Sequence, residues 1–600
     1  MSKLADWFDK RTGYRKLLEA ALDEEVRGGA RWSYVFGSGL LVIFAAQVIT
    51  GLLLMATYAP STTGAWASVF YIQHKVAGGW FVRGLHAYGA QAMMVVVGMH
   101  MLQVAIYGAY KAPREVTWWF GLALLGLVQG LALTGYLLPW DQKGYWATKV
   151  ATNIAGTVPG VGAALQTLLV GGAEYGQATL TRFFVLHVGV LPGLLVLLTT
   201  AHVYLFRRHG VTPPANADIG RVEPFYPYQV AKDMGFAVLV VLVLALLTAT
   251  SHGAHLDAPA DPATDYPPRP EWYFLFLFQL LKYLPGDMEL VGTVIVPGVG
   301  LLFLFVLPFL DRGSKTSLVP RLPWLAPIGL GVIAMVVLTG LSLYDDSQDM
   351  AFQRARAQAQ LRAERVMLLA QRGIPPAGPL ELLRRDPLTQ GADVYAQHCQ
   401  SCHILNGVGE RGGPDHTGFG SRPWIMGMLH DPQAPAYFGT TDIDDMDSMA
   451  GLGKLKLQAV TEYLYAQGHA PGDPPFNPVF AEEGKQVFAD ECMDCHMIGD
   501  EGAEVFDGPN LTGYGSKAWI VGQIRTPGAE SQYGDLNEMP DFQEEVSDHD
   551  LRMVTEFLRM QRFADATQAA EVVAEQGESA VGSGESGAPV ADPAAKTGQE

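Results

Sequence analysis

All four cysteines of this 600-residue chain lie in two copies of one short motif. Each copy places two cysteines three positions apart and a histidine directly after the second. The copies are Cys399, Cys402 and His403, then Cys492, Cys495 and His496. The pattern C-x-x-C-H is typical of covalent attachment of a c-type haem, with two thioether bonds and one axial histidine. No thiol remains for a disulfide, a zinc finger or an iron–sulfur cluster, so the sequence predicts two c-type haems.

Each motif is followed by a methionine at the same interval. Met446 lies 43 residues after His403, and Met539 lies 43 residues after His496. A thioether as the sixth iron ligand raises the reduction potential of a haem, which suits an electron acceptor. We therefore expect Met446 to complete the first c haem and Met539 the second. Met449 is the alternative to Met446 as the thioether donor.

Four histidines stand within two long apolar stretches. His86 and His100 are 14 residues apart, and His187 and His202 are 15 apart. At a rise of about 1.5 Å per residue these intervals are about 21 and 22 Å along a helix. Ionisable groups inside a bilayer are costly and are usually functional. If both helices run from outside to inside, His86 pairs with His187 near the outer face and His100 with His202 near the inner face. Each pair is expected to hold one non-covalent b-type haem.

Glycines repeat the histidine interval on two other apolar stretches. Gly37 and Gly51 are 14 apart, as are Gly121 and Gly135. Helix packing in membranes also favours small residues. Because a missing side chain admits a bulky ring, the matching interval favours contact with the haems. Arg83 and Arg114 are candidates for contact with haem propionates, although arginines at helix ends often extend towards water instead.

The composition is that of a membrane protein with an extramembrane part. The chain is 49% hydrophobic and 17% charged, against roughly 25% charged residues in soluble proteins. From residue 345 onward it holds 18 Lys and Arg against 41 Asp and Glu. This acidic half would repel phosphates, so nucleic acid is not an expected partner. Seven apolar stretches approach the roughly 20 residues that cross a bilayer: about 34–57, 81–107, 117–138, 183–206, 233–251, 290–310 and 323–344.

Basic residues set the expected orientation. The N-terminal segment and the loops after the second, fourth and sixth stretches are rich in Lys and Arg, whereas the opposite loops are poorer. Positive loops stay in the cytoplasm. The start of the chain is charged and lacks the apolar run of a signal peptide. We therefore expect a cytoplasmic N-terminus and, after seven crossings, an extracytoplasmic segment beyond residue 344.

The acidic half contains an internal repeat. GPDHTGFGSRPWI at 413–425 matches GPNLTGYGSKAWI at 508–520, and AVTEYL at 459–464 matches MVTEFL at 553–558. Each repeat is expected to be one small helical haem domain. The expected divisions are an N-terminal segment 1–32, membrane domains 33–210 and 211–344, a linker helix 345–390, haem domains 391–470 and 471–563, and a disordered Ala-, Gly-, Glu- and Ser-rich tail 564–600.

Three runs resemble cytochrome b of quinol-oxidising bc complexes. They are PREVTWW at 113–119, GYLLPWDQKGYWATK at 135–149 and PEWYF at 270–274. Residues 31–210 are similar to the four-helix dihaem part of the photosynthetic b6f type, and residues 224–344 to its three-helix partner, here in one chain. The resemblance implies an all-α fold: a seven-helix transmembrane dihaem bundle followed by two small helical cytochrome c domains.

In that family PEWY marks the outer quinol-oxidation site. Quinol releases protons with its electrons, so a carboxylate that accepts a proton and turns towards water is needed. Glu271 is the candidate, with Tyr273 and Tyr136 ordering hydrogen bonds. Pro270, Trp272, Pro139 and Trp140 are expected to shape the pocket. The alternative is that Glu271 is only an acid favoured by the dipole at a helix start.

The resemblance further implies a bacterial quinol:cytochrome c oxidoreductase in the cytoplasmic membrane. One electron would pass through a Rieske iron–sulfur protein to the c haems and a soluble cytochrome c or similar acceptor. The other would cross the two b haems to quinone, building a proton gradient in a Q cycle within a homodimeric complex. Unlike the b6f type, the segment 32–37 has no cysteine for an extra haem. Alternatives are a haem-containing membrane anchor that relays electrons from a dehydrogenase, or the same complex running in reverse.

Overall fold

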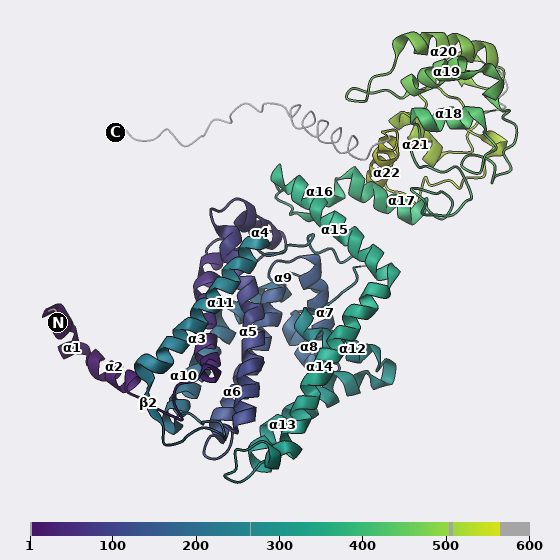
Figure 1. Ribbon diagram of the computed structural model, residues 1–600. Coiled ribbons are helices and arrows are strands. Elements are labelled where there is room, and N and C mark those ends of the chain that lie inside the picture. The colour runs from purple at the N-terminus through teal and green to yellow at the C-terminus, as the bar shows by residue number, and fades with distance from the viewer. Residues whose placement is uncertain (1–2, 265, 503–507, 564–600) are drawn as a thin grey trace, which may run out of the picture. The chain divides into compact units, whose positions relative to one another are not determined.

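The structure, a computed structural model, describes residues 3–264, 266–502 and 508–563. The tail that was expected to be disordered therefore lies outside the described residues. The chain forms two compact units, one up to Leu382 and one from Leu383. Almost all regular structure is helical (Figure 1), and the strands among the described residues form two short two-stranded ladders. The all-α prediction is confirmed.

The first unit is a bundle of long helices connected by shorter ones (Figure 1). Its elements are α1 (Lys3–Thr12), α2 (Tyr14–Leu22), β1 (Glu25–Arg27), α3 (Val35–Met55), α4 (Ala65–His74), α5 (Gly79–Tyr107), α6 (Glu115–Tyr136), α7 (Gln142–Gly156), α8 (Gly162–Val170), α9 (Gln177–Val185), α10 (Leu191–His209), β2 (Val222–Pro224), α11 (Val230–Thr250), α12 (Leu275–Lys282), α13 (Val296–Leu310), α14 (Leu322–Gln348) and α15 (Met350–Gln371).

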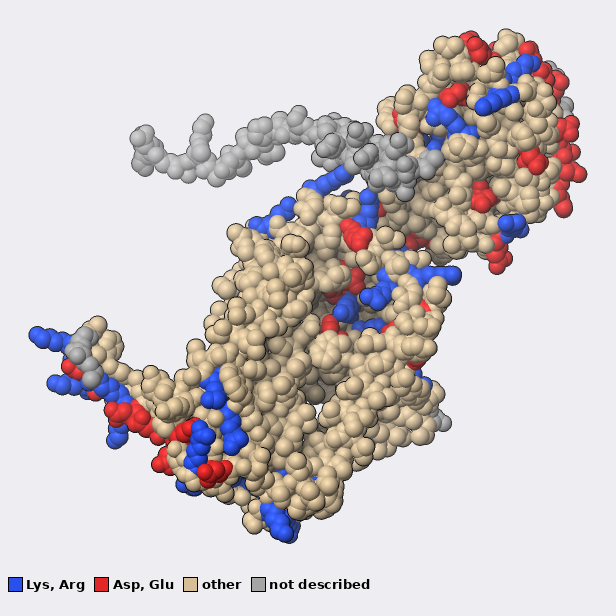
Figure 2. Space-filling model, viewed as in Figure 1, with Lys and Arg blue, Asp and Glu red and all other residues tan. Residues whose placement is uncertain are grey.

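Within the described residues, seven helices are long and apolar enough to cross a membrane, as predicted. They are Trp32–Met55, Gly79–Tyr107, Glu115–Tyr136, Gln177–His209, Phe225–Thr250, Val291–Leu310 and Val319–Gln348. A broad uncharged surface covers this part of the first unit in Figure 2. Such a surface suits contact with lipid, where no water is present to solvate charged groups. The chain is an integral membrane protein.

The Lys- and Arg-rich connections meet at one end of the bundle. Strand β1 pairs with β2, which joins the N-terminal segment to the loop after α10. The carboxylate of Glu24 lies 2.9 Å from the guanidinium of Arg207 in the same region. The loop after α5 joins the loop after α13 through a 2.6 Å ion pair between Lys111 and Asp311. The structure thus gathers on one side the loops that the charge pattern assigns to one side.

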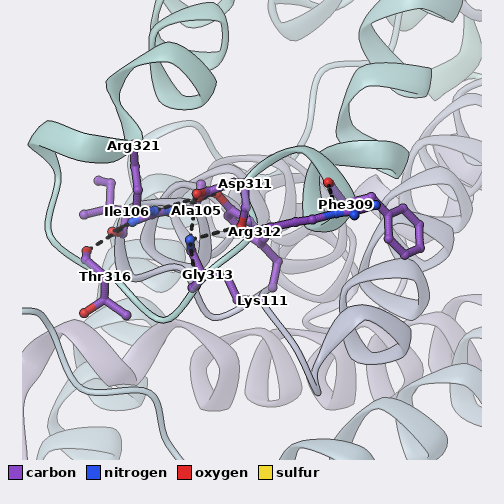
Figure 3. A network of polar contacts seen from close by, with 10 residues as sticks. Ala105, Ile106, Lys111, Phe309, Asp311, Arg312, Gly313, Thr316 and Arg321 are labelled. Carbon is purple, nitrogen blue, oxygen red and sulfur yellow. Dashed lines mark hydrogen bonds and ion pairs between the residues drawn. The ribbon is translucent and has the colours of Figure 1, made fainter.

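Around Asp311 this end is held by a buried polar network (Figure 3). The carboxylate accepts from Lys111 Nζ at 2.6 Å, Arg321 Nε at 2.8 Å and the Tyr110 hydroxyl at 2.5 Å. Arg321 also donates to the backbone carbonyls of Ala105 and Ile106, at the end of α5. The network therefore ties the four-helix part of the bundle to the three helices that follow it.

The other end of the bundle is built from the opposite loops. Trp66 of α4 donates through Nε1 to the carbonyl of Asp257 at 2.7 Å, and Tyr58 donates to the carbonyl of Leu138 at 2.7 Å. Lys143 at the start of α7 pairs with Glu271 just before α12. These contacts bring the loops after α3, α6 and α11 together around the PEWY segment.

The second unit contains the two C-x-x-C-H motifs. Its elements are α17 (Ala392–His398), α18 (Arg422–His430), α19 (Lys454–Gln467), α20 (Pro478–Glu491), β3 (Met497–Ile498), β4 (Glu501–Gly502), α21 (Lys517–Arg525) and α22 (Asp548–Met560), preceded by the short α16 (Leu380–Arg384) at the boundary between the units. In Figure 1, α18, α19 and α20 stack together, whereas α17, α21 and α22 lie at the other end of this unit.

This grouping differs from two consecutive haem domains. One core combines α18 and α19 of the first repeat with α20 of the second, through Leu429, Val460 and Phe488. The other combines α17 of the first repeat with α21 and α22 of the second, through Tyr395 and Val554. The repeats exchange helices, so the expected boundary at residues 470 and 471 does not separate two haem domains. Elements of similar sequence can pack on either copy, which is the physical basis of such an exchange.

Candidate haem and quinol sites

Two long helices carry the four membrane histidines. His86 and His100 lie on α5, and His187 and His202 lie on the continuous span Gln177–His209. That span contains a π-helical turn at Leu186–Val190, in which His187 stands. Pro192 has no N–H to bond the carbonyl four residues before it, which accounts for the widened turn. Turns of this kind often lie at functional sites.

The histidines form the two predicted pairs. The ring centroids of His86 and His187 are 6.2 Å apart, and those of His100 and His202 are 6.5 Å apart. Two iron–nitrogen bonds of about 2 Å, with about 1.1 Å from nitrogen to ring centre at each end, require about 6.2 Å. Each pair is therefore spaced to hold one metal ion between its imidazoles, which fits a bis-histidine haem.

Three of these imidazoles are oriented through their Nδ1 atoms. The partners are the Thr50 hydroxyl at 2.9 Å for His86, the Leu131 carbonyl at 3.1 Å for His187 and the Thr117 carbonyl at 3.0 Å for His202. A carbonyl can only accept, so His187 and His202 donate from Nδ1 and leave Nε2 unprotonated for a metal. Among the described residues His100 Nδ1 has no partner.

Each of the four spaced glycines lies against one of the histidines. A Cβ at Gly135 would stand 2.5 Å from Cε1 of His187, and one at Gly51 would stand 3.3 Å from Cε1 of His86. At Gly121 and Gly37 the corresponding distances to His202 and His100 are 3.5 and 3.6 Å. The glycines therefore admit the imidazole rings between the helices, and Gly135 has the least room for a side chain.

The two arginines expected near haem propionates have protein partners. Arg83 is buried and donates to the carbonyls of Ala254 and His255 and to the side chain of Gln73, at 2.5, 2.7 and 2.7 Å. Arg114 donates to the carbonyl of His209 at 2.8 Å. A buried guanidinium has to satisfy its N–H groups, and the nearby loop carbonyls do so for Arg83. Arg83 therefore fixes the outer loop after α11, and contact of either arginine with a haem propionate stays a prediction.

Glu271 does not cap the helical turn that it precedes. Glu271 stands at the N-cap position of the turn Trp272–Phe274, but its carboxylate makes no bond to the first backbone N–H groups. The carboxylate instead pairs with Lys143 at 2.8 Å, and the Glu271 side chain is 19% exposed. Sequence reasoning missed Lys143, although it lies within the run at 135–149; its only signal was a cation close to Trp140 and Trp146.

Aromatic side chains surround this ion pair. Lys143 Nζ lies 5.5 Å from the ring centre of Tyr136, whose buried hydroxyl has no hydrogen-bond partner among the described residues. Tyr273 packs at 5.4 Å against Trp272, and Trp272 Nε1 lies 3.4 Å from the side-chain oxygen of Gln91 on α5. A buried, unpaired hydroxyl beside a carboxylate is suited to hydrogen-bonding a substrate.

Trp140 has a structural role beside the same site. It adopts the left-handed backbone conformation with φ of 51°, is buried, and packs edge-on against Tyr145 at 5.7 Å. The next residue, Asp141, accepts from the backbone N–H of Gly144 and so caps α7. Burial and the nearby Asp257 raise the pKa of Asp141. Pro139 and Trp140 thus set the turn that brings Lys143 to the PEWY segment.

The PEWY segment is also anchored to the last membrane helix. Arg269, which directly precedes Pro270, forms two hydrogen bonds of 2.9 Å with the carboxylate of Asp346 at the end of α14. Gln279 on α12 donates to Asp345 at 2.6 Å. A bidentate Arg–carboxylate pair fixes direction as well as distance. The position of Glu271 is therefore set from both sides, by Lys143 on α7 and by Arg269 through α14.

In the second unit the two motif histidines have matching surroundings. His403 Nδ1 lies 2.8 Å from the Pro414 carbonyl, and His496 Nδ1 lies 2.9 Å from the Pro509 carbonyl. Burial lowers the pKa of both histidines. Each is therefore a neutral imidazole that donates from Nδ1 and offers Nε2 to a metal. With two cysteines next to each histidine, the donor set fits a covalently bound haem.

The cavity beside the first motif has an unexpected wall. It has a volume of about 260 Å³ and is lined by Cys399, Cys402 and His403 together with Met539 and Phe542 from the second repeat. Met539 was expected to accompany His496. The structure differs because α21 and α22, which flank Met539, pack on the first motif's helix.

The corresponding loop of the first repeat joins the other core. Met446 and Met449 pack around the same group of side chains as Cys492 of the second motif. This core holds α20, the helix that leads into the second motif. Met446 was expected to accompany His403, and the same exchange of helices accounts for the difference.

Family models match three parts of the chain. Residues 91–259 match cytochrome b(N-terminal)/b6/petB and residues 259–356 match cytochrome b(C-terminal)/b6/petD. A cytochrome b subunit of a cytochrome bc complex from Chlorobaculum thiosulfatiphilum is 36% identical over 320 residues, which cover 52% of this chain and 73% of the relative. The chain belongs to the cytochrome b family of bc complexes. Residues 480–558 match cytochrome c oxidase, cbb3-type, subunit III, so this cytochrome b continues into a cytochrome c part, and haems of both types are implied.

Two further matches agree with this family. A menaquinol:cytochrome c reductase cytochrome b subunit from Geobacillus thermodenitrificans is 40% identical over 222 residues, which are 36% of this chain and 99% of the relative. A solved structure titled hyperthermophilic respiratory Complex III superposes with a TM-score of 0.51 and 30% identity, covering 60% of this chain and 95% of that one. The similarity thus spans the membrane unit.

Proposed function

We propose that this chain is the cytochrome b–cytochrome c subunit of a bacterial quinol:cytochrome c oxidoreductase. The proposed reaction is oxidation of quinol at the outer membrane face, coupled to reduction of cytochrome c and to proton translocation in a Q cycle. The observation that carries the proposal is the joint presence of two imidazole pairs, spaced for a metal, and an anchored PEWY segment in one bundle. A simple membrane anchor needs the imidazole pairs but no such segment.

The residues of this chain have defined roles in the proposal. His86 and His187 hold the outer b haem, and His100 and His202 hold the inner one. His403 and His496 each bind a c haem. When bound, these haems would supply one-electron carriers for the electrons released by quinol. Glu271 accepts a proton from the quinol hydroxyl and turns away from Lys143 as it becomes neutral, because the pair then loses its charge attraction.

The sidedness and partners follow from the same proposal. The end of the bundle that carries Lys111 and Arg207 faces the cytoplasm, and the PEWY end faces outward. The haem-binding second unit is then periplasmic. All four cysteines belong to C-x-x-C-H motifs. A Rieske cluster needs two cysteines and two histidines, so it has to reside on a partner chain. A soluble cytochrome c or a similar protein is the proposed acceptor, and the complex is proposed to be a homodimer.

Glu271→Gln tests the proposal. General-base groups contribute about 10²- to 10⁴-fold to rate, so we expect quinol-dependent cytochrome c reduction by the purified complex to fall at least about 100-fold. Haem content should not change. Glu289→Gln, which alters an exposed glutamate in the loop after α12, is the matched control. Unchanged turnover in Glu271→Gln would favour a haem-containing anchor that takes electrons from a dehydrogenase.

A further inference from the structure

In the second unit, the two exchanged helix pairs make equivalent contacts at equivalent residues. Gly391, eight residues before Cys399, lies directly against Met553 and Phe557 of α22. Gly484, eight residues before Cys492, lies directly against Ala459 and Tyr463 of α19. Ala459 and Tyr463 occupy the positions in AVTEYL that Met553 and Phe557 occupy in MVTEFL.

Each motif helix therefore crosses the last helix of the other repeat, at equivalent positions. Neither glycine tolerates a side chain, since a Cβ there would stand closer to these neighbours than a normal van der Waals contact allows. Glycine at a crossing point is the usual way in which two helices approach closely. Both helix crossings therefore join the motif helix of one repeat to the last helix of the other repeat.

The loop that carries each methionine directly precedes the last helix of its repeat, and it lies beside the same core as that helix. Met539, which precedes α22, lines the cavity of Cys399, Cys402 and His403. Phe542 from the same loop packs at 6.2 Å against His398, the residue before Cys399. The two methionine loops also contact each other: the backbone N–H of Asp442 donates to the Glu538 carboxylate at 2.6 Å. Each loop thus lies where the other repeat's motif can use it.

We propose that the two c haems have crossed ligands. The haem attached at Cys399 and Cys402 takes His403 from the first repeat and Met539 from the second. The haem attached at Cys492 and Cys495 takes His496 and, from the first repeat, Met446. Met446 is chosen over Met449 because it occupies the position equivalent to Met539, 43 residues after its own motif histidine. This inference rests on c-haem attachment alone and not on quinol oxidation.

Chains with a single c haem test the pairing. In Cys492→Ala/Cys495→Ala, only the haem at Cys399 and Cys402 remains. There we expect Met539→His to remove the methionine-to-ferric-iron charge-transfer band and to lower the reduction potential, because imidazole replaces a thioether. Met446→His should leave the band in place. The reverse pattern would overturn the proposal.

The reciprocal chain completes the test. In Cys399→Ala/Cys402→Ala, we expect Met446→His to remove the band and Met539→His to retain it. Met428→Leu, a partly buried methionine in the same core as Met446, is the matched control and should retain the band. Loss of the band in Met449→Leu but not in Met446→His would overturn the choice of Met446.

A second experiment keeps both haems and does not depend on maturation of the single-haem chains. A protease site is inserted between Pro471 and Gly472, which are exposed in the loop between α19 and α20. After cleavage, each crossed haem still joins a motif from one fragment to a methionine from the other. We expect the fragments to remain together on gel filtration, with both charge-transfer bands retained. Fragments that separate, each with its band, would overturn the proposal.

Discussion

Gly135→Ala should weaken the outer b-haem site more than any of the other three matching glycine substitutions. The added Cβ would stand 2.5 Å from Cε1 of His187, whereas ordinary contacts are 3.4–4.0 Å. The imidazole therefore has to move by about 1 Å, and overpacking of this kind costs about 1–3 kcal/mol. At 1.4 kcal/mol per tenfold change, haem binding at this site should weaken by about 5- to 140-fold.

The assay is haem retention by the purified chain during transfer to an excess of a haem-scavenging protein, followed in reduced-minus-oxidised spectra. Gly126→Ala on the same helix is the control, since no atom lies within 4 Å of its Cβ position. Gly37→Ala and Gly121→Ala, at 3.6 and 3.5 Å, should lose little. Retention in Gly135→Ala equal to that of the unsubstituted chain, or equal losses in Gly126→Ala, would refute the reasoning.

Three further predictions concern the buried network, the PEWY anchor and the haem count. Asp311→Asn removes the counter-charge of Lys111 and Arg321 and should destabilise the detergent-solubilised protein by about 3–5 kcal/mol, measured as a fall in the thermal unfolding midpoint. Burial raises the pKa of Asp311, but the hydrogen bonds from Lys111, Tyr110 and Arg321 outweigh burial and hold the pKa below its ordinary value. The stabilisation by the ionised carboxylate is therefore present at neutral pH and should be lost only as the pH falls below about 4. Arg269→Ala should slow quinol oxidation without loss of haem; unchanged kinetics would show that the anchor is dispensable. Pyridine haemochrome analysis should give two b and two c haems per chain, and a third c haem would contradict the absence of a cysteine at 32–37.

The membrane unit could be predicted closely from the sequence because its signals are local. Apolar length defines a span, and the fixed rise of a helix converts a 14-residue interval into a depth. His86 and His187 therefore meet in the structure as the intervals predicted. What the intervals could not show is the direction of an individual polar side chain. Arg83 has several acceptors within reach, and only the folded loop shows that the carbonyls of Ala254 and His255 are its partners.

The ion pair of Glu271 illustrates the same limit for the quinol site. The PEWY motif identifies the Glu271 carboxylate in the sequence. Its partner Lys143 lies 128 residues earlier, on α7, and the turn at Trp140 determines how close α7 comes to the PEWY segment. A contact over that separation has no periodic signal. It arises from the packing of two outer loops, which the sequence places on the same side of the membrane without fixing their register.

The second unit shows why a regular spacing can mislead. The interval of 43 residues between histidine and methionine is identical in both repeats, and it remains identical whether each methionine serves its own motif or the other one. Local propensity is equally neutral, because both arrangements use the same helices and the same loops. Only contacts between repeats distinguish them, such as Gly391 against α22 and Gly484 against α19. Which methionine lies near which motif depends on the segment between each motif and the helix that follows it. In the first repeat this segment crosses from one core to the other at about Ser421, and in the second repeat at about Ser516. Both serines cap the next helix through their hydroxyls, so the crossing is made at a fixed helix start in each repeat.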